Sequence, residues 1–162
     1  MTRKRRREEG KTDYRARLNL LKSNLPRIVF RKTNKYIIGQ YVKSEEAKDK
    51  VVIGVNSKML LKYGWNNEMA GSLKSLPASY LTGFLLGRKI IDKEDKTKAV
   101  FDLGLIRNVP KSRAYAFLKG VVDAGVDINC NEKIFPDEAR ISGKHMKKSI
   151  DFQKIRKELE NA

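Results

Sequence analysis

Two residues of this 162-residue chain could form a reactive or metal-binding centre, because Cys130 is its only cysteine and His145 its only histidine. A single cysteine allows no intramolecular disulfide, and a single histidine excludes a metal site built from several imidazoles. A catalytic thiol–imidazole pair would need a third group to orient the base, and the sequence indicates none. Glycine-rich phosphate loops of the G-x-x-x-x-G-K-[ST] and G-x-G-x-x-G types are absent from the sequence. We therefore expect no cofactor, no metal and no enzymatic activity.

Phosphate binding is the chemistry that the charged residues favour. The chain carries 36 Lys and Arg against 19 Asp and Glu, a formal net charge of +17. Residues 1–35 hold 13 of these cations and only three acids. Such a surplus destabilises a folded chain by self-repulsion unless an anion lies opposite it, and nucleic acid is the first candidate. An uninterrupted cationic run opens the chain: Arg3, Lys4, Arg5, Arg6 and Arg7.

Other cations and two tyrosines extend this basic region toward an RNA ligand. Arg15 and Arg17 are left for solvent or a ligand on a short helix, and Arg27, Arg31, Lys32 and Lys35 flank a predicted hairpin. Tyr14 is equally expected to stack on a base or to pack in the protein, whereas Tyr36 favours ligand contact. Trp65 favours a loop-anchoring role over stacking. A second basic cluster, which is as consistent with an exposed helix face as with an RNA-facing one, comprises Arg140, Lys144, His145, Lys147, Lys148, Lys154, Arg156 and Lys157.

Membrane and secretory classes are not favoured. The longest uncharged stretch, residues 75–87, is shorter than the roughly 20 residues of a spanning helix. The N-terminus shows no apolar signal region, so we expect a cytosolic protein.

The first half of the chain predicts a helix, three strands and a short helix. Thr12 or Asp13 can cap a helix that ends near Ser23. Residues 27–32 and 36–42 read as the two strands of a hairpin, with Gly39 as a possible bulge. A charged loop is expected at 43–50, then a strand at 51–55 buried on both faces, a short helix at 57–63 ended by Gly64, and a loop at 65–75.

The second half predicts two packed helices around another strand. Pro77 suits the first turn of a helix to about residue 90, in which Gly83 and Gly87 would permit a close approach to the sheet. A strand is expected at 97–103 and a helix at 113–124, capped by Ser112 and closed by Gly125. The remainder is irregular, with a further helix over about 149–160.

This order predicts an α/β fold of the α+β class. Short connections favour a three-strand antiparallel meander, and a helical crossover should place the fourth strand parallel to a neighbour, in the order of a ribonuclease-H-like fold. A nuclease of that type would need several carboxylates on metal ions, but only Asp102 is available in the corresponding elements. We read Asp102 as a strand-end or capping residue, and we expect a basic arm with a short helix at 1–24, a globular body at 25–128 and a C-terminal extension at 129–162.

Several segments together resemble one family, the archaeal-type large-subunit ribosomal proteins that bind 5S rRNA (universal ribosomal protein family eighteen). The resemblance runs from about residue 3 to residue 146, in matching order and spacing. Its segments are R-R-R-E-x-G-K-T-D-Y-R-A-R-L at 5–18, L-P-A-S-Y-L-T-G at 76–83, D-L-G-L at 102–105, F-L-K-G at 117–120, D-A-G at 123–125 and I-F-P-D-E-A-R-I-S-G-K-H at 134–145.

The resemblance implies a structural, RNA-binding role in the central protuberance of the large ribosomal subunit. It implies that 5S rRNA contacts Arg3 to Lys11, Tyr14, Arg15, Arg17, Arg27, Arg31, Lys32, Asn34, Lys35 and Tyr36. It also implies that Arg140, Lys144 and His145 touch the large-subunit rRNA. The implied protein neighbours are the other 5S-binding large-subunit protein (universal family five) and an archaeal/eukaryotic-specific large-subunit protein.

Overall fold

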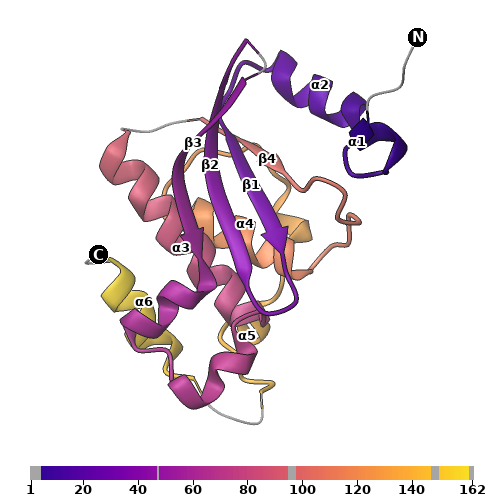
Figure 1. Cartoon of the computed structure of the whole chain (residues 1–162). Coiled ribbons are helices and arrows are strands. Elements are labelled where there is room, and N and C mark those ends of the chain that lie inside the picture. Colours follow the sequence, from indigo (N-terminus) through magenta and orange to yellow (C-terminus); the bar gives the residue numbers. More distant parts are fainter. Residues whose placement is uncertain (1–4, 47, 95–97, 147–149, 161–162) are drawn as a thin grey trace.

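One mixed sheet of four strands, in the order β3-β2-β1-β4, organises the fold in the computed structural model (Figure 1). The structure describes residues 5–46, 48–94, 98–146 and 150–160. β1 (Arg27–Lys32) pairs antiparallel with β2 (Ile37–Glu45), β2 pairs antiparallel with β3 (Lys48–Asn56), and β4 (Val100–Asp102) lies parallel to β1. The predicted α+β class, with its antiparallel meander and parallel fourth strand, is therefore confirmed.

The hairpin of β2 and β3 is longer than the sequence predicted. The charged loop expected at 43–50 is wrong, because the ladder continues until Glu45 pairs with Lys48. The strand expected to be buried on both faces lies instead at an edge of the sheet, where Val51 is half exposed. A charged sequence can form a strand at an edge because its side chains reach solvent there.

Gly39 is not a bulge, since the register shift between β2 and β3 lies between Tyr41 and Val42. Gly39 pairs with Phe30 of β1, and a Cβ at position 39 would lie 2.6 Å from the ring of Phe117. The missing side chain therefore makes room for an aromatic ring of the core.

Helices α3 (Leu76–Lys93) and α4 (Arg113–Asp123) cover one face of the sheet, behind the strands in Figure 1. Ser75 caps α3 by accepting a hydrogen bond from Ala78 N, and Pro77 occupies the first turn, as predicted. Gly83 and Gly87 do allow a close approach, but the neighbour is α4 and not the sheet. A Cβ at Gly83 would lie 2.1 Å from the backbone oxygen of Phe117.

The core lies between the sheet and these two helices. Phe117 of α4 packs against Phe30 and Phe101, with ring centroids 5.3 and 6.3 Å away. In α6 (Phe152–Glu160), Ile155 and Leu159 are buried, and the ring centroid of Phe152 lies 5.4 Å from that of Tyr80 in α3. Because these contacts span distant parts of the sequence, one apolar interior holds the helices and the sheet together.

Short helices complete the described chain. The predicted helix at 57–63 forms as a 3-10 helix, capped by Asn56 and closed by Gly64 at a φ of 85°. A further 3-10 helix lies where only a loop was expected, and Trp65 beside it is buried and donates Nε1 to Met69 O at 3.2 Å, so the loop-anchoring interpretation is confirmed. The short elements are α1 (Arg5–Glu8), α2 (Tyr14–Lys22), η1 (Ser57–Tyr63), η2 (Asn67–Ser72), η3 (Glu132–Ile134), α5 (Glu138–Ile141) and α6 (Phe152–Glu160).

The N-terminal helices α1 and α2 lie beside the end of the sheet at which β1 begins, away from α3 and α4 (Figure 1). In the part of the chain that the structure describes, no helix crosses the other face of the sheet (Figure 1), which we call the open face. None of the described helices is long and apolar enough to cross a membrane.

Candidate nucleic-acid interface

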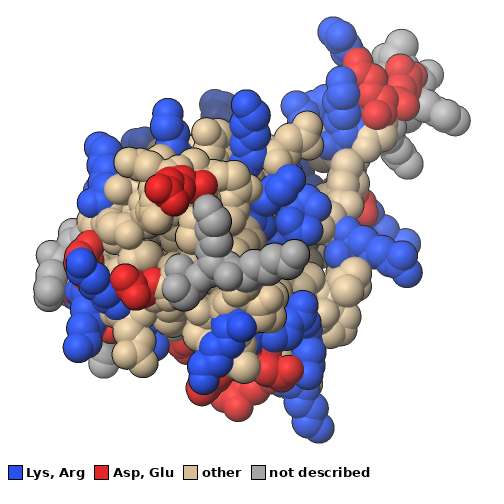
Figure 2. All heavy atoms as spheres, turned by 90° about the horizontal axis from the view of Figure 1, so that it is seen from below, with Lys and Arg blue, Asp and Glu red and all other residues tan. Residues whose placement is uncertain are grey.

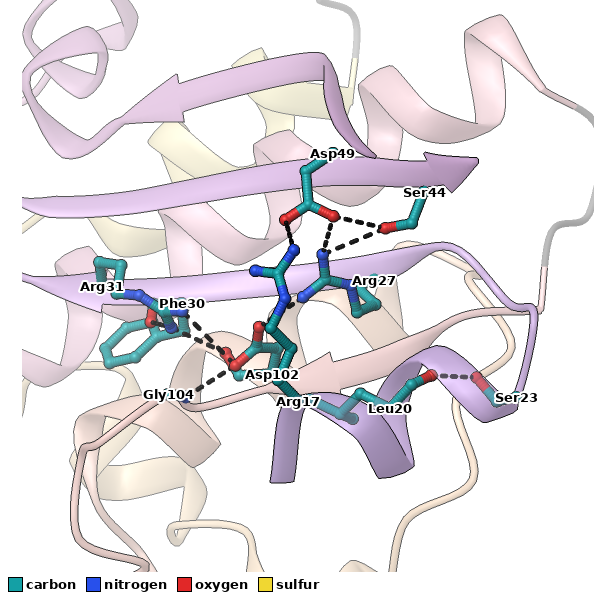
Figure 3. Close-up of polar contacts among 10 residues, drawn as sticks. All are labelled: Arg17, Leu20, Ser23, Arg27, Phe30, Arg31, Ser44, Asp49, Asp102 and Gly104. Carbon is teal, nitrogen blue, oxygen red and sulfur yellow. Dashed lines mark hydrogen bonds and ion pairs between the residues drawn. The ribbon is translucent and has the colours of Figure 1, made fainter. Parts of the chain in front are cut away.

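A ladder of alternating charges crosses the open face of the sheet (Figure 3). Arg17 of α2 pairs with Asp49 of β3 at 2.9 Å, and the same carboxylate pairs with Arg27 of β1 at 2.7 Å. On the other side, Arg27 pairs with Asp102 of β4 at 3.1 Å. A longer contact of 3.5 Å joins Asp102 to Arg31 of β1. The ladder therefore connects the N-terminal helix to three strands of the sheet.

The register of the strands brings these side chains to one face. Directly paired residues point to the same side of a sheet, and residues two apart along a strand do as well. Arg27 pairs with Val42, and Ser44, two residues further along β2, pairs with Asp49. Without the register shift beyond Tyr41, Lys50 would lie opposite Ser44. The shift therefore places a carboxylate, and not a lysine, beside Arg27.

The two carboxylates of the ladder differ in their burial and in their hydrogen bonds. Partial burial raises the pKa of Asp49, but hydrogen bonds from Ser44 and Arg27 and the charges of Arg27 and Arg17 outweigh it, so the pKa lies below its usual value. Asp102 is buried at the end of β4 and accepts a hydrogen bond from Gly104 N at 2.7 Å. The strand-end interpretation of Asp102 is therefore confirmed.

The same carboxylates are not arranged for metal chemistry. Among the described residues, no group of three or more His, Cys, Asp or Glu could hold a metal ion. Both oxygens of Asp102 face arginine donors, so this carboxylate serves the ion ladder.

A groove runs between the N-terminal segment and the open face, and it gathers cations from both. We call it the arm groove. On one side lie residues of the segment before and within α2, and on the other lie β1 and the turn after β4. Asp13 fixes the start of α2 by accepting hydrogen bonds from the backbone N–H groups of Arg15 and Ala16, both at 3.0 Å. Besides the buried Arg27, the predicted phosphate-binding residues that line the arm groove are Arg6, Lys11, Arg17, Arg31 and Lys32.

Other predicted contact residues lie elsewhere. Arg15 is exposed and Tyr14 half-buried on α2. Asn34, Lys35 and Tyr36 form the turn between β1 and β2, about 20 Å along β1 from Arg27 at the usual rise per residue. Tyr36 is half-buried and packs against the core. Arg3 and Lys4 lie outside the described residues, and for Arg7 the structure describes only the backbone.

The C-terminal basic residues form a separate group. Arg140 lies in α5, and Lys144 and His145 follow it; all three are exposed. In Figure 1, α5 lies at the end of the molecule where the β1–β2 turn lies, opposite the end that carries α2. Two basic regions therefore occupy opposite ends of the sheet.

Arg27 is buried, unlike the other predicted contact residues whose side chains the structure describes. Its side chain is only 5% exposed and is paired with two carboxylates. It lies on the same face of β1 as Arg31, but Ser44, Asp49 and Asp102 from the other three strands surround its guanidinium. We therefore assign Arg27 to the internal ladder at the wall of the arm groove.

The sequence analysis did not identify Asp49 and Ser44, because both lie in the segment that was predicted to be a loop. A usable signal was present, since Glu45 and Lys48 are opposite charges that flank a two-residue turn and can pair across a hairpin.

Positive charge also dominates the surface beyond the groove. Figure 2 shows Lys and Arg side chains around most of the visible face, with Asp and Glu in smaller groups and the N-terminal arm projecting from the body. Within the arm, Glu9 accepts from Lys11 at 2.7 Å and Arg5 at 2.8 Å. The hydrogen bond from Lys11, with that from Arg5, holds the pKa of Glu9 below its usual value. Glu9 therefore acts as a local counter-charge within the larger cationic surplus of the arm.

Comparisons with known proteins agree with the resemblance seen in the motifs. Residues 1–98 match the profile of the family described as "Ribosomal large subunit proteins 60S L5, and 50S L18". The chain is 49% identical over 142 residues to the "Large ribosomal subunit protein uL18" of Korarchaeum cryptofilum, covering 88% of this chain and 70% of that protein. Proteins of the same name are 46% identical over 143 residues in Methanococcus maripaludis and 43% over 142 residues in Methanoregula boonei. Both matches cover 88% of this chain, with 72% and 79% of the respective relatives.

Proposed function

Because this chain belongs to the family of large-subunit ribosomal proteins that comprises 60S L5 and 50S L18, and is not an enzyme, we propose that it binds 5S rRNA and helps attach it to the large-subunit rRNA. Family membership makes it a cytoplasmic constituent of the large ribosomal subunit. The finer proposal places it in the central protuberance, as a holder of RNA.

The arm groove carries this proposal. Five predicted phosphate ligands, from two segments of the chain, line one concave surface. Lys and Arg side chains neutralise phosphates of any sequence and release the counterions bound to the RNA. A groove with cations on both walls can contact phosphates of a folded RNA backbone from two sides. We therefore assign the 5S rRNA to the arm groove, to the remaining arm cations and to Arg15 and Tyr14.

The second basic region supports a second RNA contact. Asn34, Lys35 and Tyr36 form the β1–β2 turn, and Arg140, Lys144 and His145 lie in the C-terminal extension at that end of the molecule. We propose that the turn belongs to the 5S rRNA surface and that the C-terminal group reaches the large-subunit rRNA. In this scheme residues 1–24 are the RNA-binding arm, 25–128 the body and 129–162 the extension.

The proposal includes protein neighbours at the 5S rRNA. We expect the other 5S-binding large-subunit protein, of universal family five, and an archaeal/eukaryotic-specific large-subunit protein to lie beside this chain.

A filter-binding titration tests the RNA ligand. The full chain should bind 5S rRNA in preference to random duplex DNA at equal phosphate concentration. With six to ten phosphate contacts, its affinity should fall by about a thousandfold or more between 50 and 200 mM salt. A flat salt response, or equal binding to both polyanions, would show that the chain is not a specific 5S rRNA ligand.

A further inference from the structure

Asp49 stands where a negative charge should weaken the binding of an anion. Its carboxylate lies between Arg17 and Arg27, and both arginines line the arm groove. If RNA binding depended on charge alone, this acid would lower the affinity, since phosphates and carboxylates compete for the same guanidinium groups. Its position therefore calls for a structural reason.

We propose that Asp49 is a positioning residue for RNA binding: it holds the guanidinium of Arg17, and with it helix α2, at the wall of the arm groove. This inference rests on the proposed function, because the groove is the surface assigned to 5S rRNA. Asp49 itself need not touch the RNA.

The packing of α2 shows why such a tether matters. None of the residues of α2 is buried, so its apolar side chains fix its place on the body only in part. Helices usually owe their position to a buried apolar face. The ion pair of 2.9 Å between Arg17 and Asp49 supplies a directional link from α2 to β3. A change that removes this link should let α2 and its cations sample other positions.

Within the ladder, Arg27 and Ser44 hold Asp49 through a different oxygen from the one that contacts Arg17. Asp49 Oδ1 accepts hydrogen bonds from Arg27 Nη2 and Ser44 Oγ, both at 2.7 Å. The other oxygen, Oδ2, is the one that meets Arg17. A carboxylate fixed on one side by a buried arginine presents its second oxygen in one direction, so Arg17 is oriented before RNA arrives. Such preorganisation raises affinity because less side-chain freedom is lost on binding.

The chemistry requires a carboxylate at this position. An asparagine would keep one oxygen but would turn an NH₂ group toward one of the two arginines, which are donors only. Three arginines share the two carboxylates of the ladder, so one positive charge remains at the groove wall for a phosphate.

The experiment compares Asp49→Asn and Asp49→Glu in the full chain, with Glu45→Gln as the matched control. Glu45 is an exposed acid of the same hairpin, four positions away. Binding to Methanococcus maripaludis 5S rRNA is measured by filter titration. Asp49→Asn should lower the affinity about tenfold although it removes a negative charge. Asp49→Glu should restore much of it, and Glu45→Gln should leave it equal or slightly higher. Wild-type or tighter binding by Asp49→Asn would overturn the proposal.

The salt dependence separates positioning from a general loss of structure. Asp49→Asn and Arg17→Gln should each reduce the slope of log affinity against log salt by about one, and the double variant should show no further loss. An unchanged slope, or additive losses, would overturn the proposal. If Asp49→Asn shows no thermal transition, and is therefore unfolded, Asp49→Glu and Arg17→Gln are compared in its place. The affinity and the salt slope of these two variants then decide by the same criteria.

The experiment distinguishes a failure of this inference from a failure of the proposed function. If the wild-type chain shows no preference for 5S rRNA over duplex DNA, the proposed function fails. If the wild type shows that preference and Asp49→Asn binds more tightly, only the role of Asp49 fails.

Discussion

Arg27 Nη1 lies 3.1 Å from Asp102 Oδ2, in an ion pair whose two side chains are each less than a tenth exposed. The pair joins β1 to the short strand β4, which has only three residues of ladder to hold it. Asp102 also accepts from the backbone of Gly104 and so fixes the turn that forms one wall of the arm groove. A carboxylate on the strand where a nuclease would carry a metal ligand therefore serves the architecture of the groove that we propose binds RNA.

Replacing Asp102 by Asn should destabilise the protein. Removing one partner of a buried ion pair is strongly destabilising, and Arg27 would keep only Asp49 as its counter-charge, so we expect a loss of about 3 kcal/mol in the free energy of unfolding. Chemical denaturation measures it. The control, Asp92→Asn, changes an exposed acid of α3 and should alter stability by less than about 0.5 kcal/mol. Equal effects of the two substitutions would show that the Arg27–Asp102 pair contributes little.

Gly83→Ala should also destabilise the protein, although alanine favours helices over glycine by about 1 kcal/mol. The new Cβ would lie 2.1 Å from the backbone oxygen of Phe117, so α3 and α4 would have to move apart. We expect a net loss of about 1–3 kcal/mol. Gly71→Ala is the control, because a Cβ there has no atom within 4 Å. A Gly83→Ala protein as stable as wild type would contradict this close packing.

Deleting residues 1–11 should weaken binding to 5S rRNA and leave the body folded. The described residues of the N-terminal segment, 5–24, include no buried side chain, so the body loses no core contact. Filter binding should show a lower affinity and a shallower salt dependence, because six cations are removed. A thermal melt should retain its transition, and its loss would refute the division into arm and body.

Leu81→Ala should have the opposite effects to that deletion, because it should lower stability and leave RNA binding unchanged. Leu81 is fully buried in α3, and the cavity should cost about 2–5 kcal/mol of stability. At a temperature where the variant is folded, its RNA affinity should equal that of the wild type.

Acid should protonate Asp49, and so break its ion pairs in the ladder, only at a pH below the usual pKa of an aspartate. The pKa of Asp49 is lowered in the folded protein, so its pairing with Arg27 and Arg17 stabilises the fold above the unfolded pKa of about 3.9. This contribution is lost as the pH falls through the lower, folded value. A carbon-13 NMR titration of the Asp49 carboxyl should show a midpoint below 3.9. In Arg17→Gln it should move upward, and a midpoint at or above 3.9 in the wild type would contradict the ion pairs.

Local signals in the sequence sufficed for several elements. Asp13 accepts the side-chain hydrogen bonds that start α2, where the sequence predicted a cap, and Pro77 lies in the first turn of α3 as predicted. The 3-10 helix η1 spans the predicted residues 57–63. The β-branched and aromatic run of β1 also has its predicted bounds, 27–32. Capping and strand preference depend on a few neighbouring residues, so they can be read without the fold.

The longer hairpin could not be read in this way. Residues 43–50 are charged, and charge alone does not distinguish a loop from an edge strand. A charged segment can form an edge strand where neighbouring residues supply the opposite charges. Lys48 lies opposite Glu45 in the ladder, and Glu94 pairs with Lys43 at 2.5 Å. These pairings exist only once β2, β3 and α3 are assembled.

By itself, the sequence determined a cationic N-terminus, a mixed α+β body and the motifs of a ribosomal protein family. Only the tertiary structure decided which cations face outward. Arg27 and Arg31 are four residues apart on one strand and look alike in the sequence, yet the first is buried between two carboxylates and the second is 42% exposed in the arm groove. The difference arises because β4 and the shifted register of β3 bring Asp102 and Asp49 to Arg27 from segments 75 and 22 residues away.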